Sequence, residues 1–538
     1  MGSPAPSPTS RPAPMSSTTT SWKPSPTATS TAPLTSAPRY KSEVCTILIN
    51  LFIDYLIINT MSTLKYFDTL KNALDVYQFA NANEEHLNEV VFPKVATQLL
   101  YGGFFLLNGK EKLYLREIEF YFINMDGSIQ EDKLYRKDLP DDEWLEAGTL
   151  FPHNSGIDIT FEDHEKHKFR ASVLIRAFDL FNMDNTPIIL DNGRSLSVYD
   201  ILLSRSNIFD GVSIKWMDEW TEPRTKIKTQ QRQGLKGAQA YRTWNFRRNE
   251  NLFISLDKEV NKVYFSDKVM VKHDISQIYK EICDILDEYG IKHELLPHTK
   301  DIWCRDYMPV QMSPNRFVQY VYEPDYLDND QYRNTKTSPD AVCDAIHLAR
   351  SKSKLILDGG NIIRTPQGVI MTRKAYNSNK MSQKEFEDIF KQDFGVNKIT
   401  WLNWDRREIY GHADGIVRYI SADHVLMTNY SEIDKMSAIS FRKALEQDGY
   451  KVEELHYSSN ALPRSDDDLS WAYINFLQTS KVIIVPLLGI EKQDAEALKQ
   501  IQDTYSGIDV KGVYALPLLK EDGGFNCFSW TVNEIIDR

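Results

Sequence analysis

Four short polar segments in the second half of the chain carry the side chains that could do chemistry. They read DIWCRDYMPV (301–310), LDGGN (357–361), GHADGIVRYI (411–420) and GGFNC (523–527). Each is polar where the surrounding sequence is typical of apolar strands. Together they supply a thiol, an imidazole and several carboxylates, and the sequence has no CxxC pair and no Cys/His cluster with the spacing of metal ligands. The segments are therefore candidates for one metal-free site.

No single segment is sufficient to assign a function to its residues. Cys527 alone is most simply a buried, inert thiol. His412 and Asp414 are two residues apart, so on a strand both side chains would face one side and could share a proton-transfer site. A surface hydrogen bond is the more common outcome for such a pair. Asp358 beside two glycines fits a tight turn, and Asp306 fits a structural ion pair with an arginine.

Taken together, these side chains suit attack on a cationic, planar carbon. A guanidinium group is always charged and presents a fork of N–H donors to carboxylates. Two aspartates could hold it still and select a cation over a neutral substrate. A thiolate is the natural nucleophile for its resonance-stabilised carbon. The set therefore predicts chemistry on a guanidino group.

The order of the motifs resembles that of the guanidine-modifying, or pentein, superfamily. W-x-R-D is followed by acidic-G-G, by G-H-x-D and by a glycine-rich turn that ends in Cys. The resemblance is to agmatine deiminases and bacterial-type peptidylarginine deiminases, over about residues 260–538. YINFL (473–477) before VIIVPLLG is also similar to a segment of that family. The resemblance implies an α/β fold in the form of a five-bladed propeller with the site in its central channel.

The family's catalytic roles transfer to matching positions of this sequence. The resemblance implies Cys527 as the nucleophile and His412 as the general acid and base. Asp306 and Asp414 would bind the guanidinium nitrogens, and Asp358 would orient the histidine or the substrate.

The implied reaction has two halves and needs no cofactor and no metal. A thiouronium forms with loss of ammonia, and water then releases a ureido product. Trp303 and Asn475 complete the implied substrate-binding set.

The substrate stays open between agmatine, which would place the enzyme in putrescine biosynthesis, free arginine and peptidyl-arginine. Agmatine deiminases usually have Glu at the position of Asp358 and a longer glycine run with His before the nucleophile. The segment DRREIY (405–410) is basic, which would repel an ammonium tail but could meet a carboxylate or a peptide backbone. An amidinotransferase or a dimethylarginine hydrolase would share the same constellation.

Residues 61–250 predict a smaller α+β domain with a different resemblance. Its strand sequences are similar to those of the alkyladenine DNA glycosylase family, with Glu119 and Tyr121 as the E-x-Y pair and Arg176 as the following arginine. Between residues 224 and 248 there are eight Lys or Arg and no acidic residue, which suits phosphate contacts. The alternative functions are therefore a nucleic-acid-binding or base-processing protein, or a structural relic of that fold.

Residues 1–60 differ from the rest of the chain. Nine of the 23 prolines fall in residues 1–40, among Ser, Thr and Ala, so a disordered extension is expected. The apolar run CTILINLFIDYLIINT (45–60) is too short to predict a membrane span. We expect Met61 to be the natural start.

Composition limits the partners. The 538 residues have a net charge of −12, which argues against wholesale nucleic-acid binding. The five scattered cysteines predict no disulfide framework and favour a reducing, cytoplasmic setting. We expect a small guanidino substrate or peptidyl-arginine, no membrane, and at most a weak nucleic-acid contact through 224–248. The oligomeric state stays open, with a homodimer as one alternative.

Overall fold

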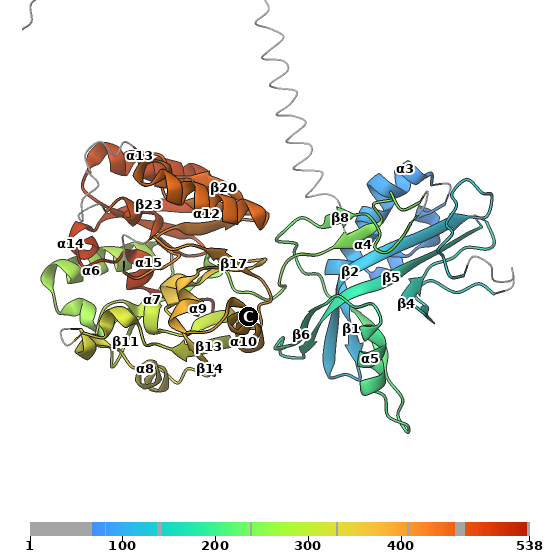
Figure 1. The fold of residues 1–538 in the computed structure, drawn as a ribbon, viewed down its shortest axis with the longest axis horizontal. Coiled ribbons are helices and arrows are strands. Elements are labelled where there is room, and N and C mark those ends of the chain that lie inside the picture. The colour runs from blue at the N-terminus through green and yellow to red at the C-terminus, as the bar shows by residue number, and fades with distance from the viewer. Residues whose placement is uncertain are drawn as a thin grey trace, which may run out of the picture. The chain divides into compact units, whose positions relative to one another are not determined.

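The computed structural model describes residues 67–80, 82–136, 143–166, 168–236, 239–329, 332–405, 409–457 and 469–534 (Figure 1). The predicted extension 1–60, with its apolar run and the expected start at Met61, lies outside these residues. Within them no helix is long and apolar enough to cross a membrane.

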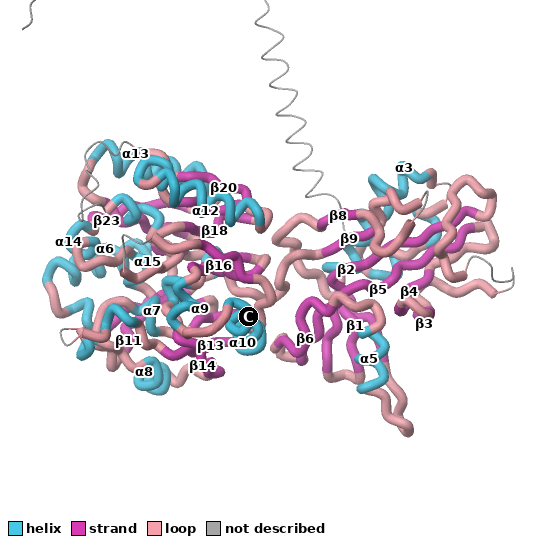
Figure 2. The backbone as a smooth tube through the Cα atoms, viewed as in Figure 1, coloured by secondary structure: helices cyan, strands magenta, loops and turns pink. Residues whose placement is uncertain are grey.

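The first part of the described chain is an antiparallel sheet of nine strands with short helices. The strand order is β3-β4-β5-β2-β1-β7, with β6 beside β5, β9 beside β2 and β8 beside β9 (Figure 2). The strands are β1 (Gly103–Leu107), β2 (Glu111–Asn124), β3 (Leu150–His153), β4 (Gly156–Thr160), β5 (Phe169–Asn182), β6 (Pro187–Asn192), β7 (Ile214–Asp218), β8 (Lys228–Gln230) and β9 (Asn245–Arg247). The helices are α2 (Leu70–Ala73), η1 (Val76–Gln78), α3 (Glu84–His86), η2 (Leu87–Val91), α4 (Phe92–Tyr101) and α5 (Ser197–Ser204).

Helix α4 and the two longest strands form the core of this part. Phe92 of α4 stacks on Phe120 of β2, with ring centroids 4.3 Å apart, and also contacts Trp244 at 5.1 Å. The α+β class predicted for this region is confirmed, while the predicted boundaries at 61 and 250 remain a prediction.

The second part consists of five three-stranded sheets with one topology. In every sheet a central strand pairs antiparallel with one neighbour and parallel with the other. A helix connects the central strand to its parallel partner, because parallel neighbours need a crossover. The five-bladed α/β propeller implied by the resemblance is therefore present.

The blades are defined by the following elements. The central strands are β10 (Lys262–Ser266), β13 (Arg316–Val321), β16 (Gly368–Thr372), β19 (His424–Met427) and β22 (Val482–Leu487). Their parallel partners are β11 (Lys292–Leu296), β14 (Ser351–Ile356), β17 (Ile399–Leu402), β20 (Lys451–Glu454) and β23 (Asp509–Tyr514). The crossover helices are α6 (His273–Glu288), α8 (Pro339–Ala345), α10 (Gln383–Phe394), α12 (Lys435–Gln447) and α13 (Glu491–Thr504). The antiparallel partners are β24 (Trp530–Val532), β12 (Val310–Ser313), β15 (Ile363–Thr365), β18 (Val417–Ser421) and β21 (Leu477–Gln478).

Local sequence signals explain these helices. In α6, Ile275, Ile278 and Ile282 are buried at helical spacing, which forms one apolar face. Helix α10 begins after Ser382, whose side chain forms a capping box with Glu385, and ends at Gly395 with a φ of 70°.

The propeller is closed by strands from its two ends. Strand β24 pairs antiparallel with β10, and Lys262 lies opposite Val532. The Trp530 indole is 2% exposed and donates a hydrogen bond of 2.8 Å to the carbonyl oxygen of Pro309. This closure fixes the backbone three residues after Cys527.

Candidate active site

The repeated topology brings the predicted site residues together. Each lies in the segment that precedes the antiparallel strand of a blade, so the same position in every blade contributes to one centre. Asp306 lies in α7 (Cys304–Tyr307) before β12, Asp358 caps η7 (Gly359–Asn361) before β15, His412 and Asp414 precede β18, Asn475 follows η8 (Ser470–Ile474) before β21, and Cys527 lies in α15 (Phe525–Phe528) before β24.

One local prediction is wrong. His412 and Asp414 do not lie on a strand; they belong to a turn that ends where β18 begins at Val417. The amide N–H of Asp414 donates to the carbonyl oxygen of Gly360 at 3.0 Å, which holds the turn against η7. Both side chains still reach the same site because the turn folds over it.

The thiol of Cys527 is buried between an aspartate and an asparagine. It donates to Asp414 Oδ2 at 3.3 Å, and Asn475 Nδ2 donates to Sγ at 3.4 Å. The backbone N–H of Cys527 donates to Asn475 Oδ1 at 3.2 Å, so this asparagine fixes both the main chain and the sulfur. Burial, together with the charges of Asp414 and Asp306, raises the pKa of Cys527 well above its usual range. In the free protein the group is a neutral thiol.

The imidazole of His412 lies between two carboxylates. Its Nε2 is 3.2 Å from Asp358 Oδ2 and its Nδ1 is 3.7 Å from Asp306 Oδ1. Burial lowers the pKa of His412, but Asp306, Asp358 and Asp414 outweigh it and the pKa rises to about 10. The ring is therefore an imidazolium near neutral pH, with one N–H facing each of its two neighbours.

This pKa gives a prediction about stability. A histidine pKa raised from 6.5 to about 10 stabilises the folded state fully below pH 6.5, and that contribution is lost as the pH rises through about 10. We expect the urea midpoint of the natural protein to exceed that of His412→Asn at pH 7, and the difference to shrink by pH 10. The exposed His424→Asn variant should show no such pH-dependent difference; a constant difference for His412→Asn would contradict the prediction.

Asp306 completes a cluster of three carboxylates. Its Oδ1 accepts from the Gly360 N–H at 2.9 Å, and its carbonyl oxygen accepts from the Tyr320 hydroxyl at 2.6 Å. Burial raises its pKa to about 7, aided by Asp358 and Asp414 and opposed by His412. Three aspartates against one imidazolium leave a surplus of negative charge, which suits a bound cation.

One carboxylate oxygen of this cluster is available as a hydrogen-bond acceptor. Asp358 Oδ1 is buried and has no hydrogen-bond partner in the described part of the chain, although Oδ2 of the same group contacts His412. Asp414 Oδ2 accepts from the Asn526 amide at 2.8 Å. Asn526 is a residue that sequence reasoning missed, and its position immediately before Cys527 was the available signal.

Gly360 allows the cluster to assemble. A Cβ at this position would lie 2.7 Å from His412 Nδ1, 2.8 Å from Asp306 Oδ1 and 3.2 Å from Asp414 Oδ2. No side chain therefore fits between the three groups.

We expect Gly360→Ala to lower kcat/KM by about 10²-fold, because displacement of reacting groups by about 1 Å has that order of effect. Turnover and urea unfolding are measured for the same variants, which distinguishes an effect on the geometry of the site from an effect on the stability of the fold. Gly415→Ala is the matched control, since nothing lies within 4 Å of a Cβ built there. Equal losses in the two variants would contradict the prediction.

The glycines before Cys527 have a similar purpose. A Cβ at Gly523 would lie 2.2 Å from the ring of Trp303, and one at Gly524 would lie 2.7 Å from the Cβ of Asn475. Both predicted substrate-binding residues thus pack against this glycine pair. Trp303 is half-buried, which leaves part of its ring beside the site.

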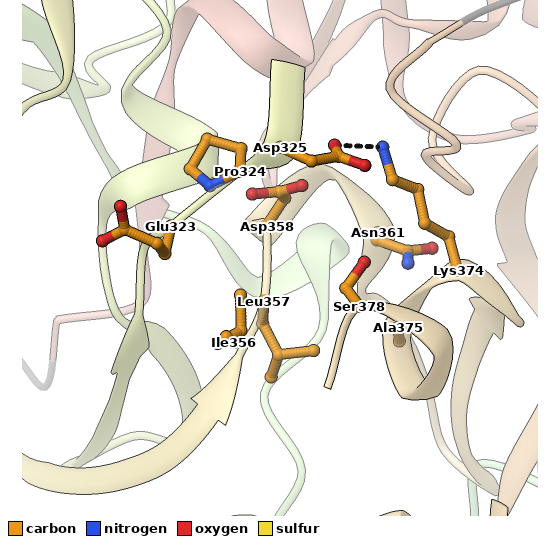
Figure 3. A pocket seen from close by; sticks show the side chains of 10 residues that line it. All are labelled: Glu323, Pro324, Asp325, Ile356, Leu357, Asp358, Asn361, Lys374, Ala375 and Ser378. Atoms are coloured by element: carbon orange, nitrogen blue, oxygen red, sulfur yellow. Dashed lines mark hydrogen bonds and ion pairs between the residues drawn. The ribbon is translucent and has the colours of Figure 1, made fainter. Parts of the chain in front are cut away.

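Acidic groups surround a small pocket beside Asp358 (Figure 3). Its lining includes Glu323, Asp325 and Asp358 against one cation, Lys374. Lys374 Nζ is 2.9 Å from Asp325 Oδ1, as the dashed line in Figure 3 marks. Tyr326 lies near this pocket and faces His412 edge-on, with ring centroids 6.3 Å apart. The basic pair Arg406 and Arg407, predicted to influence the substrate tail, lies outside the described residues.

The three residues suggested for the first domain share a network. The Tyr121 hydroxyl donates to Glu119 Oε1 at 2.6 Å, while Oε2 accepts from the Gln233 N–H and from Asn245 Nδ2, both at 3.0 Å. Arg176 joins through Gln233 Oε1 at 3.0 Å. Glu119 is 0% exposed and both its oxygens are engaged by the protein. That is the environment of a structural carboxylate, and a water-activating role for it remains a prediction.

The basic segment 224–248 is largely neutralised by its surroundings. Of its five arginines, three are at most 5% exposed. Four pair with acidic residues within the first part: Arg232 with Glu131, Arg242 with Glu84, Arg247 with Glu117 and Arg248 with Asp179. The charge that stays open to a phosphate backbone is that of the exposed lysines Lys226, Lys228 and Lys236, and the nucleic-acid contact also remains a prediction.

A five-bladed α/β propeller with a cysteine, a histidine and aspartates in its centre places the chain in the guanidine-modifying class of proteins. A family model described as Porphyromonas-type peptidyl-arginine deiminase matches residues 239–532, which is more than half of the chain. The chain therefore belongs to that family.

Individual relatives are more distant. A Lactococcus lactis protein named "Putative agmatine deiminase" is 27% identical over 211 residues, covering 32% of this chain and 56% of the relative. The agmatine deiminase of Medicago truncatula is 23% identical over 224 residues, covering 35% and 60%. The chain thus spans a little over half the length of these curated relatives. The solved structure titled "C. Jejuni Agmatine Deiminase" is 19% identical, with a TM-score of 0.45 over 52% of this chain and 96% of that chain.

Proposed function

We propose that this protein hydrolyses a guanidino group to a ureido group and ammonia, with Cys527 as the nucleophile. The observation that supports this most strongly is the meeting of Cys527, His412 and three aspartates in one centre, which four different blade connections supply. Membership in a peptidyl-arginine deiminase family supports the same reaction.

The free site is arranged so that the substrate activates the nucleophile. Asp414 and Asp306 raise the pKa of Cys527 because their negative charges oppose a thiolate. A guanidinium bound between these two carboxylates adds a positive charge beside the sulfur and opposes that effect. The thiol then loses its proton, for which the contact with Asp414 offers a route, and Sγ attacks the guanidinium carbon.

His412 can serve both halves of the reaction. As an imidazolium it donates a proton to the departing nitrogen, so ammonia leaves and a thiouronium remains on Cys527. The ring is then neutral and takes a proton from the water that attacks the same carbon. Collapse of that adduct breaks the C–S bond. The sulfur recovers its proton through the contact with Asp414, and the ureido product leaves after its extra proton has passed to solvent, where it converts ammonia to ammonium. Asp358 holds the ring at Nε2 throughout.

Agmatine is the first substrate to test. The pocket beside Asp358 has three carboxylates against one lysine, which favours a cationic tail over a carboxylate tail. Free arginine and peptidyl-arginine are the other candidates, as are the amidinotransferase and dimethylarginine hydrolase reactions of the same constellation.

Ammonia release measured with agmatine, free arginine and an N-acyl-arginine amide tests the proposal. We expect turnover with at least one of them and a ureido product by mass spectrometry. No ammonia from any of the three, with dimethylamine released from added dimethylarginine or an amidine transferred to an added amine acceptor, would assign one of the alternative reactions.

We also propose that residues 61–250 and 260–538 form separate domains, that the first contributes at most a weak nucleic-acid contact, and that the protein is cytoplasmic. A reactive thiol needs a reducing setting, which supports the last point. Salt-dependent binding of the full chain to a damaged DNA duplex would support an independent role for the first domain.

A further inference from the structure

A second pocket borders the segments that form the active site. Arg305 lines it while the next residue, Asp306, belongs to the site. Similarly Gly359 lines it, whereas the preceding Asp358 faces the first pocket. Segment η7 therefore contributes to both pockets, through Asn361 in the first and Gly359 in the second, while α7 contributes Arg305 to the second pocket and Asp306 to the site.

The charged side chains that line this second pocket are both arginines, Arg305 and Arg364. Arg305 uses Nε to hold the carbonyl oxygen of Asn526 at 3.2 Å and Nη2 to hold Thr531 Oγ1 at 3.0 Å. Within the described residues its Nη1 has no hydrogen-bond partner, and the side chain forms no ion pair. A half-buried guanidinium without a counter-ion is costly.

The carboxylate nearest to these arginines is already engaged. Asp257 contacts Arg364 Nη2 at 2.6 Å and Arg418 Nη2 at 3.1 Å. Burial raises its pKa, but Arg364, Arg418 and Arg305 outweigh that effect and lower it to about 2. Two aspartates, Asp257 and Asp414, act on Arg305 against the charges of Arg364 and Arg418, so the three guanidinium groups keep a surplus of positive charge in this region.

We propose that this pocket is a binding site for a small carboxylate anion, held by Arg305 and Arg364. A guanidinium fork matches the two oxygens of a carboxylate. The remaining walls include Met308, Ile362 and Trp530, which suit a short aliphatic tail better than a fully hydrated inorganic anion.

The site has a direct connection to the catalytic centre. The guanidinium of Arg305 holds the main chain of Asn526, and the side chain of Asn526 holds Asp414. Cys527 is the next residue. An anion that fixes Arg305 fixes the segment that presents the nucleophile, so its binding raises turnover; this consequence rests on the proposed function.

Thermal unfolding of the full chain tests the binding. Acetate, propionate, chloride and phosphate are compared at one ionic strength, balanced with a bulky sulfonate buffer. We expect acetate and propionate to raise Tm saturably by about 2 °C or more, with a smaller effect from chloride and phosphate. The absence of a Tm shift with acetate or propionate at concentrations up to about 100 mM would overturn the site. Equal Tm shifts from all four anions would overturn its selectivity for carboxylates.

Two variants separate this site from nonspecific anion effects. Arg305→Gln removes the uncommitted donor, and Val310→Trp fills the pocket without a change of charge. Both should abolish the carboxylate shift, while Arg333→Gln, at an arginine whose side chain donates to the Asp328 carbonyl oxygen and does not line the pocket, should retain it. A shift that persists in both pocket variants would contradict the proposal.

The coupling is tested separately by the rate of Cys527 modification with a haloacetamidine in the presence and absence of propionate. We expect propionate to accelerate modification in the natural protein and not in Val310→Trp. Binding without acceleration would overturn the coupling alone. Because the Tm readout needs no turnover, failure of the deiminase proposal and failure of this site give different results.

Discussion

Replacement of Cys527 by alanine is expected to lower turnover by about four orders of magnitude or more, the scale on which loss of a covalent nucleophile acts. Alanine removes the thiol proposed to form the thiouronium, whereas the buried carboxylates proposed to bind the guanidinium remain. Substrate should therefore still bind. Ammonia release measures the loss, and equilibrium binding of agmatine to the variant measures what is retained.

Cys283→Ala is the matched control for this result. Cys283 is also a buried thiol, and burial raises its pKa to about 11, but it lies in α6 with its side chain beside Tyr279. Its replacement should leave turnover within about twofold. In the natural protein, a haloacetamidine should add to Cys527 and leave Cys283 free. Ammonia release by Cys527→Ala at a tenth of the natural rate would contradict the nucleophile assignment.

The side chains proposed for catalysis could be singled out from the sequence because each interrupts an apolar pattern. Asp306, Asp358 and Cys527 sit between strands, where a polar residue has no role in packing. Their common location follows from the repeated blade, since equivalent connections converge on one centre. Sequence patterns identified the strands and helices of these repeats without showing how the circle closes.

The features of the fold and the site that the sequence does not predict depend on contacts between residues far apart in the chain. The closure of β10 on β24 joins residues about 270 apart, and no local periodicity encodes that pairing. The need for glycine at 360 arises from His412, Asp306 and Asp414, which all approach the same backbone atom. The spacing of His412 and Asp414 fits a strand because two residues is the period of a strand, and local sequence does not distinguish that strand from the turn that is present.

In the first domain the sequence identifies a pair of residues but not the environment of their side chains. Glu119 and Tyr121 occur at the spacing of an E-x-Y pair and do hydrogen-bond to each other. Sequence cannot tell whether the carboxylate faces a substrate or the interior. Here Gln233 and Asn245 occupy its second oxygen, and they come from a segment more than 110 residues away.

Asp414→Asn should separate the two effects that this aspartate has on the site. Loss of a carboxylate that pairs with the guanidinium is expected to lower kcat/KM by about 10²-fold or more. The reactivity of Cys527 toward neutral iodoacetamide should move in the opposite direction. Asp414 raises the pKa of this thiol, so its neutralisation increases the thiolate fraction, by about tenfold for each unit by which that pKa falls.

Asp358→Asn provides the matched comparison, because the same substitution is made in the same cluster. Asp358 contacts His412, whereas the carboxylates with the largest effect on the pKa of Cys527 are Asp414 and Asp306. It should therefore lose turnover without faster alkylation. Alkylation rates at pH 7.5 for the natural protein and the two variants, with the adduct located by peptide mass spectrometry, decide between the outcomes. Faster alkylation in Asp414→Asn alone would show that the acidic centre suppresses the thiolate until a cation binds, and an unchanged rate in that variant would contradict substrate-assisted activation of Cys527.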